Sequence, residues 1–487
     1  MATTGVLVTM PNAARRPWLI QGGMGIAVSH WPLARAVAAA GQIGVVSGTG
    51  IDSVFVRRLQ DHGVDGELGA VLERFPSQHV VEQVLARFAR ARRSSAARYR
   101  NIAMPSHRSS RVAVELTVLA SFAEVALAKL GHTGTVGLNL LTKIQLPTVP
   151  SLYGAMLAGV DVVLMGAGIP AHVPGILDRL ARGDVVETPL AITGPAPRSG
   201  APVLRFDPAW LATPTPPRRP AFFGIVSSHV LATALTRRAS GTVEGFVVER
   251  AVAGGHNAPP RGPLVLDDRG QPVYGPRDEV DLEAMRDLGV PFYLAGGVTT
   301  PEHVRGALDA GAAGVQVGTL FAYCRESGMD PRLRADVVAA AQCGGVEVTT
   351  STRASSTGYP FKVASVAGTL SDGAVYAHRE RVCDLGYLRE AYVTADGAIG
   401  YRCPAEPVQS YLAKGGSPEE TVGRVCLCNA LMATAGLGQL RRGRTAEPPI
   451  VTSGDEVADI VRLAGADSSY GAADVIAHLG RDLPTAT

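Results

Sequence analysis

Short runs of apolar, often β-branched residues alternate along this chain with longer segments in which apolar residues recur at helical spacing. Eight such runs occur, at residues 18–21, 43–47, 135–139, 161–165, 221–226, 245–248, 291–295 and 314–317. Helical spacing follows several of them, at 32–40, 151–158 and 171–181. Strand, helix and strand in this order form the βαβ unit of a parallel sheet. Eight strands predict a closed (β/α)₈ TIM barrel, because an open doubly wound sheet more often has about six.

The repeat predicts one barrel over residues 16–325 with two insertions and an appended C-terminal region over 326–487. The first insertion, at about 52–110, is rich in arginine and predicts added helices with a solvated basic face. The second, at about 184–220, is rich in proline and predicts an extended excursion or a hairpin.

Composition narrows the class of protein. The 487 residues are 46% hydrophobic and 18% charged, which suits a large buried core. The net charge of +3 gives no indication of a nucleic-acid partner. The start of the chain shows no apolar core of signal-peptide length, and no later stretch reaches the roughly 18 apolar residues of a membrane span. We therefore expect a soluble, cytoplasmic protein that acts on a small molecule without a membrane partner, with homo-oligomerisation left open.

Glycine-rich motifs follow several predicted strands, where barrel enzymes place their active sites. Gly22-Gly23-Met24-Gly25 follows the first strand, and Gly254-Gly255-His256 follows the sixth. Ala295-Gly296-Gly297 and Gly318-Thr319 follow the seventh and eighth, whose paired loops commonly bind phosphate in such barrels. Glycines also let a flat ring approach the backbone closely. His256, placed between these loops, is therefore interpreted as a catalytic residue.

These motifs resemble the nitronate monooxygenase (2-nitropropane dioxygenase-like) family of FMN-dependent barrels over about residues 16–325. The anchors include Ile20-Gln21-Gly22-Gly23-Met24-Gly25 and the segment around Asn139. Gly254-Gly255-His256 and the last two glycine motifs complete the resemblance. It implies FMN as the cofactor and His256 as the catalytic histidine, acting as a base or as a hydrogen-bond donor to the nitronate oxygens. The residues that it implies for cofactor binding are Gly23, Met24, Asn139, Gly255, Ala295, Gly296, Gly297, Gln316, Gly318 and Thr319.

Three functions stay open. The first is an FMN-dependent oxidoreductase that oxidises a small activated substrate with O₂, as nitronate monooxygenases do. The second is an NAD(P)H-dependent flavin enoyl-thioester reductase, because the same family includes such enzymes; arginines at 87–100 would then meet an acidic carrier protein. The third is a non-catalytic flavin- or metal-binding partner protein.

All six cysteines lie in the last third of the chain. Cys383, Cys403, Cys426 and Cys428 are candidate ligands of a zinc ion or an iron–sulfur cluster, although neither Cys-x-x-Cys nor a ferredoxin spacing is present. Four ordinary reduced thiols are the alternative. Cys324 and Cys343 are expected to be packed core thiols. The polar segment 355–362 is expected to be a surface loop.

Overall fold

The computed structural model describes residues 17–89, 92–194, 197, 200, 202–211, 213, 215–442, 445–465 and 469–483. Eight parallel strands form one sheet in the order β1-β11-β10-β9-β8-β4-β3-β2, and a parallel bridge between Ile20 and Ile43 joins its two ends. The predicted TIM barrel is therefore confirmed. Its strands are β1 (Leu19–Gln21), β2 (Gly44–Ser47), β3 (Val136–Leu141), β4 (Val162–Gly166), β8 (Ala221–Val226), β9 (Gly245–Glu249), β10 (Phe292–Ala295) and β11 (Gly314–Val317).

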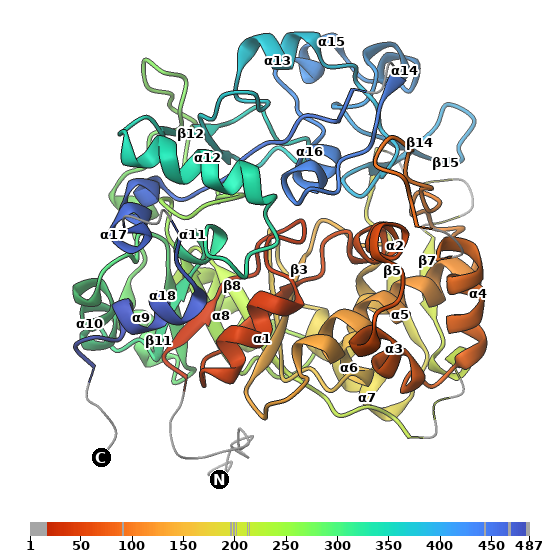
Figure 1. Ribbon diagram of the computed structural model, residues 1–487, viewed down its shortest axis with the longest axis horizontal. Helices are drawn as coiled ribbons and strands as arrows, with labels where there is room; N and C mark the ends of the chain where they lie inside the picture. The colour runs from red at the N-terminus through yellow and green to blue at the C-terminus, as the bar shows by residue number, and fades with distance from the viewer. Residues whose placement is uncertain are drawn as a thin grey trace.

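Helices surround the strands, as Figure 1 shows. They are α1 (Trp31–Ala39), α5 (Arg111–Ala128), α6 (Thr148–Leu157), α7 (Val173–Arg182), α8 (His229–Arg238), α9 (Leu282–Asp287) and α10 (Pro301–Asp309). The short α11 (Thr319–Ala322) follows the eighth strand. The last helix of the chain, α18 (Ala472–Leu479), packs against α1, α10 and α11. The end of the chain therefore returns to the helical layer of the barrel.

Alternation along the strands separates two cores. Ile20, Val45, Leu164, Phe223 and Val247 point inward and fill the barrel. Their neighbours in sequence pack outward against the helices in a second, larger cluster. Both cores are apolar, which is why the strands read as continuous apolar runs rather than as alternating ones.

The first insertion contains the predicted helices, α2 (Ile51–His62), α3 (Gly66–Glu73) and α4 (Gln78–Phe88). The next helix, α5, was not predicted. Fourteen consecutive residues of it, 115–128, are buried against α1, α2 and α6. A helix that is buried all round has no amphipathic stripe, so the periodicity of its sequence does not reveal it.

The second insertion forms the predicted hairpin. β5 (Val186–Pro189) and β7 (Val203–Phe206) pair antiparallel, and the 3₁₀ helix η1 (Pro208–Leu211) follows them. Between the two strands, β6 (Ile192–Thr193) pairs with β14 (Glu390–Val393), which pairs in turn with β15 (Ile399–Arg402). The insertion is thereby joined to the C-terminal region.

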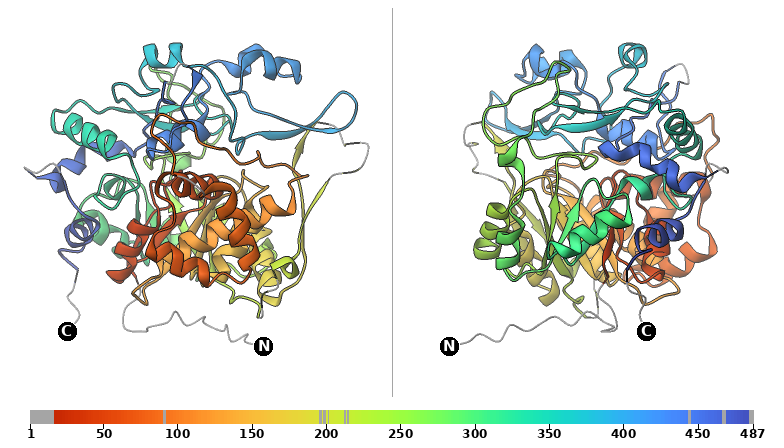
Figure 2. Two further views of the ribbon diagram at one scale, coloured as in Figure 1. Left: turned by 45° about the vertical axis from the view of Figure 1, so that its right-hand side comes forward. Right: turned by 90° about the vertical axis from the view of Figure 1, so that its left-hand side faces the viewer.

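The C-terminal region, coloured from cyan to blue, lies over one end of the barrel (Figures 1 and 2). A third apolar cluster joins Ile26 and Ile144 of the barrel loops and Val54 of α2 to Leu427 and Met432 of this region. Its elements are α12 (Pro331–Gln342), β12 (Val348–Ser351), β13 (Phe361–Ala364), α13 (Gly373–His378), β14, β15, α14 (Val408–Ala413), α15 (Pro418–Thr421), α16 (Leu427–Thr434), η4 (Asp455–Ile460) and α17 (Val461–Ala464). Among the described residues, no helix has both the length and the apolar character needed to cross a membrane.

Candidate active site

A cavity of about 230 Å³ lies at the carboxyl ends of the barrel strands, beneath the C-terminal region. All the residues that the sequence proposed for the catalytic and cofactor-binding site line this one cavity. They are Gly23, Met24, Asn139, Gly255, His256, Ala295, Gly296, Gly297, Gln316, Gly318 and Thr319. The tertiary structure thus brings together loops that lie up to 300 positions apart, while the individual binding roles stay predictions.

Glycine is required at several of these positions. Gly296 and Gly297 have φ angles of 91° and 69°, in the left-handed region that residues with a Cβ rarely adopt. A Cβ added to Gly23 would lie 2.2 Å from the Cβ of Asn139. The first and third strands therefore end close together at the cavity, and only a glycine allows this approach.

A segment distant in sequence, residues 452–454, holds two of the glycine loops in place by hydrogen bonds. The backbone N–H of Gly255 donates to the hydroxyl of Thr452 at 2.9 Å, and that of Gly454 donates to the hydroxyl of Thr319 at 3.0 Å. A Cβ on Gly254 would lie 2.8 Å from the carbonyl carbon of Ser453. The loops after strands six and eight therefore depend on the C-terminal region for their position.

His256 is held by the segment 355–362. Its Nε2 atom lies 2.7 Å from the hydroxyl oxygen of Ser355, which lies 2.8 Å from the hydroxyl oxygen of Thr357. The imidazole packs edge-on against Phe361 with 4.9 Å between ring centres. Ser355 and Phe361 are buried, so the expectation of a surface loop was wrong. From sequence alone, a short polar segment is interpreted as a surface loop, because its residues do not reveal that it packs over His256.

The electrostatic surroundings favour a neutral imidazole at His256. Burial, together with the charge of Lys143, lowers the pKa of His256 to about 4. The ammonium of Lys143 stacks over the ring of Tyr359, 4.7 Å from its centre. Apart from Ser355, no hydrogen-bond partner of the imidazole is present among the described residues, so Nδ1 is left for a ligand.

The remaining wall of the cavity is largely apolar and comes from both parts of the chain. Ile26, Leu141 and Ile144 of the barrel loops face Leu388, Leu427 and Leu431 of the C-terminal region in a lining that also includes Tyr387. The hydroxyl of Tyr387 donates a hydrogen bond to the fully buried Asp52. No sequence motif marks these residues, because the same apolar residue types occupy ordinary core positions.

The residues present fit a flavin nucleotide. The side-chain oxygen Oε1 of Gln316 is buried at the cavity without a hydrogen-bond partner, so it can accept from a ligand. A Cβ on Gly255 would meet nothing within 4 Å, and one on Gly318 would meet only Met24, at 3.7 Å. Both glycines thus leave room beside the backbone for a flat group.

The four candidate metal ligands lie near one another. Cys403, Cys426 and Cys428 are buried in one cluster, and Cys428 also lines the cavity. The charges of Cys403 and Cys426 help to raise the pKa of the Cys383 thiol, after burial. The part of the chain that the structure describes holds no group of three or more His, Cys, Asp or Glu side chains arranged to hold a metal ion. The metal site therefore stays a prediction.

The two other cysteines differ. Cys324 is fully buried, as expected, whereas Cys343 is exposed at the end of α12, so the expectation of a core thiol was wrong there. Cys343 follows the end of helix α12 and is exposed to solvent. The apolar character of cysteine does not indicate such an exposed position.

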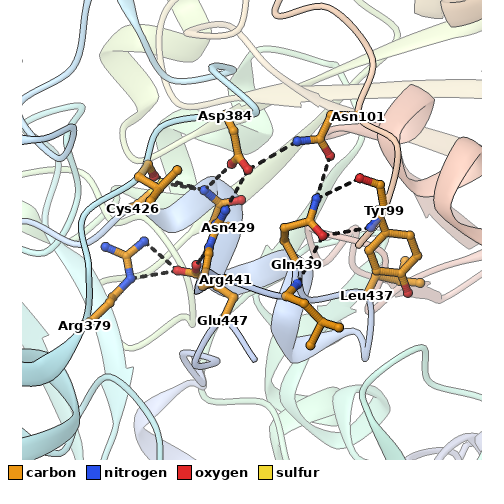
Figure 3. A network of polar contacts seen from close by, with 12 residues as sticks. Tyr99, Asn101, Arg379, Asp384, Cys426, Asn429, Leu437, Gln439, Arg441 and Glu447 are labelled. Carbon is orange, nitrogen blue, oxygen red and sulfur yellow. Dashed lines mark hydrogen bonds and ion pairs between the residues drawn. The ribbon is translucent and has the colours of Figure 1, made fainter. Parts of the chain in front are cut away.

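A polar network connects the Cys-Leu-Cys motif to the first insertion (Figure 3). Asp384 accepts hydrogen bonds from Asn101 and Asn429, and Arg441 forms an ion pair with it at 2.7 Å. Asn429 also donates to the sulfur of Cys426 at 3.5 Å. The buried Glu447 completes the network as the shared partner of Arg379 and Arg441. The insertion and the cavity wall therefore form one packed unit.

Comparisons of the sequence and the fold with known proteins show what this chain is similar to. Residues 222–370 match the family model for nitronate monooxygenase. A nitronate monooxygenase of Pseudomonas aeruginosa is 33% identical over 109 residues, which are 22% of this chain and 31% of that protein. The matched stretch thus spans about a third of the length of that relative.

Solved structures with low sequence identity are also similar. FabK from Thermotoga maritima is 14% identical with a TM-score of 0.48, and the match covers 96% of this chain and 92% of FabK. A nitroalkane oxidase from Streptomyces ansochromogenes is 13% identical with a TM-score of 0.44, and 96% of each chain is covered. The family match over 222–370 contains the last four barrel strands and His256. The predicted resemblance to the nitronate monooxygenase family is therefore confirmed over residues 222–370.

Proposed function

We propose that this protein is an FMN-dependent oxidoreductase that oxidises a small activated substrate, such as an alkyl nitronate, with O₂. The observation that carries the proposal is the position of His256. A half-buried histidine, whose lowered pKa keeps it neutral at physiological pH, lines the same cavity as the glycine loops and is oriented by Ser355. The match of residues 222–370 to the nitronate monooxygenase family supports the same function.

In this proposal the chain supplies binding, orientation and proton control. Gly296, Gly297, Gly318 and Thr319 would hold the phosphate of FMN, and Gln316 would lie beside it. Gly23, Met24 and Asn139 would border the ring system. When bound, FMN supplies the electron-accepting chemistry, which no side chain can provide.

His256 acts on the substrate in this scheme. Because its Nε2 atom faces Ser355, its Nδ1 atom is the one that meets a substrate. A neutral imidazole can accept a proton at this atom or donate a hydrogen bond from it, depending on its tautomer, and Ser355 fixes the orientation of the ring. The apolar wall around Leu427 and Leu431 excludes water and strengthens such a hydrogen bond.

The test begins with the absorption spectrum of the purified protein after FMN is supplied. Flavin bands that are bleached without oxygen by an alkyl nitronate alone support this proposal. His256→Ala is expected to bind FMN and to lose about two to four orders of magnitude in the bleaching rate. His378→Gln, a change at an exposed histidine in α13, is the matched control. A His256→Ala protein with the wild-type rate would contradict the proposal.

A second candidate is the NAD(P)H-dependent reduction of an enoyl thioester. The apolar wall formed by Ile26, Ile144, Leu388 and Leu431 favours it, because this wall suits a hydrocarbon chain better than a small nitronate. Bleaching by NADPH and not by nitronate would support the reductase. A protein that binds no flavin would leave only the non-catalytic partner function.

A further inference from the structure

Glu249 separates two cavities. It is the last residue of β9 and lies opposite Ala295 of β10 in the sheet. Its side chain lines the large cavity and also a smaller one of about 50 Å³. The smaller cavity is bounded by Ser227, Arg261 and Tyr274 among others, and Arg261 is exposed to solvent. Glu249 is therefore the residue that both the candidate active site and a solvent-facing pocket share.

The carboxyl group of Glu249 forms no hydrogen bond or ion pair with any of the described residues. Glu249 lines both cavities. Burial alone raises the pKa of Glu249 to about 8. Buried carboxyl groups are normally paired, so an unpaired one at a cavity indicates an exchangeable proton or an absent ligand.

The charged groups nearby are engaged elsewhere. Arg250, the next residue, donates to the carbonyl oxygen of Gly296. Arg261 donates to the carbonyl oxygen of Ser227 at 2.8 Å. The hydroxyl of Tyr274 donates to the carbonyl oxygen of Ala258 at 2.9 Å. The titratable and charged groups around the two cavities are Arg250, His256, Arg261, Tyr274, Asp278, Tyr387, Cys428, Asp455 and Glu456.

We propose that Glu249 is a second acid–base group of this site, which passes protons between the large cavity and water in the smaller one. In giving a proton to a group in the large cavity, its carboxyl becomes a carboxylate. It regains a proton from water on the side of Tyr274 and Arg261. The proposal rests on the proposed function for the identity of that group. His256 and Glu249 would then have different roles, since the imidazole orients the substrate and the carboxyl exchanges protons.

The first experiment follows the protonated carboxyl by infrared spectroscopy in the protein without flavin, from about pH 5 to about pH 10. We expect wild type to show a band that disappears near pH 8 and is absent in Glu249→Gln. Glu456→Gln removes an exposed carboxylate of the same cavity and is expected to keep the band. A band that is unchanged in Glu249→Gln, or no such band in wild type, would overturn the proposal.

The second experiment measures the pH profile of kcat and KM with the substrate that reduces the flavin. Wild type is expected to show an inflection in kcat that Glu249→Gln lacks and Glu249→Asp restores at a shifted pH, with KM changed less than kcat. An inflection that persists in Glu249→Gln would overturn the proposal. If no flavin binds, the proposed function fails, and the infrared titration still decides whether Glu249 exchanges a proton.

Discussion

The Nε2 atom of His256 lies 2.7 Å from the hydroxyl oxygen of Ser355, although 99 positions separate the two residues. The two residues come from different parts of the fold, a barrel loop and the C-terminal region. This hydrogen bond fixes the orientation of the imidazole and leaves its Nδ1 atom free of protein partners among the described residues. The candidate catalytic histidine of the barrel is thus oriented by a segment that follows the barrel in the chain.

We predict that Ser355→Ala lowers kcat roughly tenfold to a hundredfold, the usual effect of removing a residue that orients a catalytic or metal-binding histidine. The imidazole would lose the partner that fixes its orientation, while FMN affinity would stay near that of wild type. Steady-state kinetics and a flavin titration measure the two effects. Ser365→Ala, at an exposed serine of the same region, is the control. Equal kcat values for Ser355→Ala and this control would contradict the role of Ser355.

The burial of His256 makes stability depend on pH. Its pKa is lowered from 6.5 to about 4, so below pH 6.5 the unfolded chain binds a proton that the folded protein does not. The stabilising contribution of the neutral imidazole is present above pH 6.5 and is lost as the pH falls towards 4. We expect wild type to lose about 3 kcal/mol relative to His256→Gln over this interval. Urea unfolding at several pH values measures it, and parallel curves for the two proteins would refute it.

Gly254→Ala should weaken FMN binding. The new Cβ would lie 2.8 Å from the carbonyl carbon of Ser453, so the segment that pins the glycine loops must move. Gly306→Ala, at an exposed helical position of α10 with nothing within 4 Å, should instead stabilise the protein by about 0.5–1 kcal/mol. Flavin fluorescence and thermal unfolding test the pair. Unchanged FMN affinity in Gly254→Ala would show that the loop position is unimportant.

Glu447→Gln should destabilise the fold by about 3–5 kcal/mol. Glu447 is buried between the guanidinium groups of Arg379 and Arg441, which would face each other without their shared counter-charge. Glu302→Gln, in an exposed pair with Arg305, should leave stability close to that of wild type, because solvent screens such a pair. Denaturant unfolding of both variants measures the difference. Similar losses in the two would mean that the network of Figure 3 contributes little to stability.

The sequence was sufficient to predict the barrel because each strand is a short apolar run and several of these runs end at a glycine. The eight predicted runs correspond to β1, β2, β3, β4, β8, β9, β10 and β11. Thr300 caps α10 by accepting a hydrogen bond from the backbone N–H of His303 at 3.4 Å. Helix α5 was missed because it is apolar on every side. Local periodicity is informative only where one face of an element meets water.

The sequence by itself determined the barrel, the family resemblance and the glycine loops, including the one that carries His256. These features depend on local backbone conformation, and the loops follow strands whose carboxyl ends meet at one edge of the sheet. Only the tertiary structure decided what lies opposite them. Tyr387 and Cys428 reach the cavity, and Ser355 reaches His256, from segments that follow the barrel. Glu249 lines the cavity and pairs with none of the described residues. Such contacts depend on long-range packing, so no local pattern of residues encodes them.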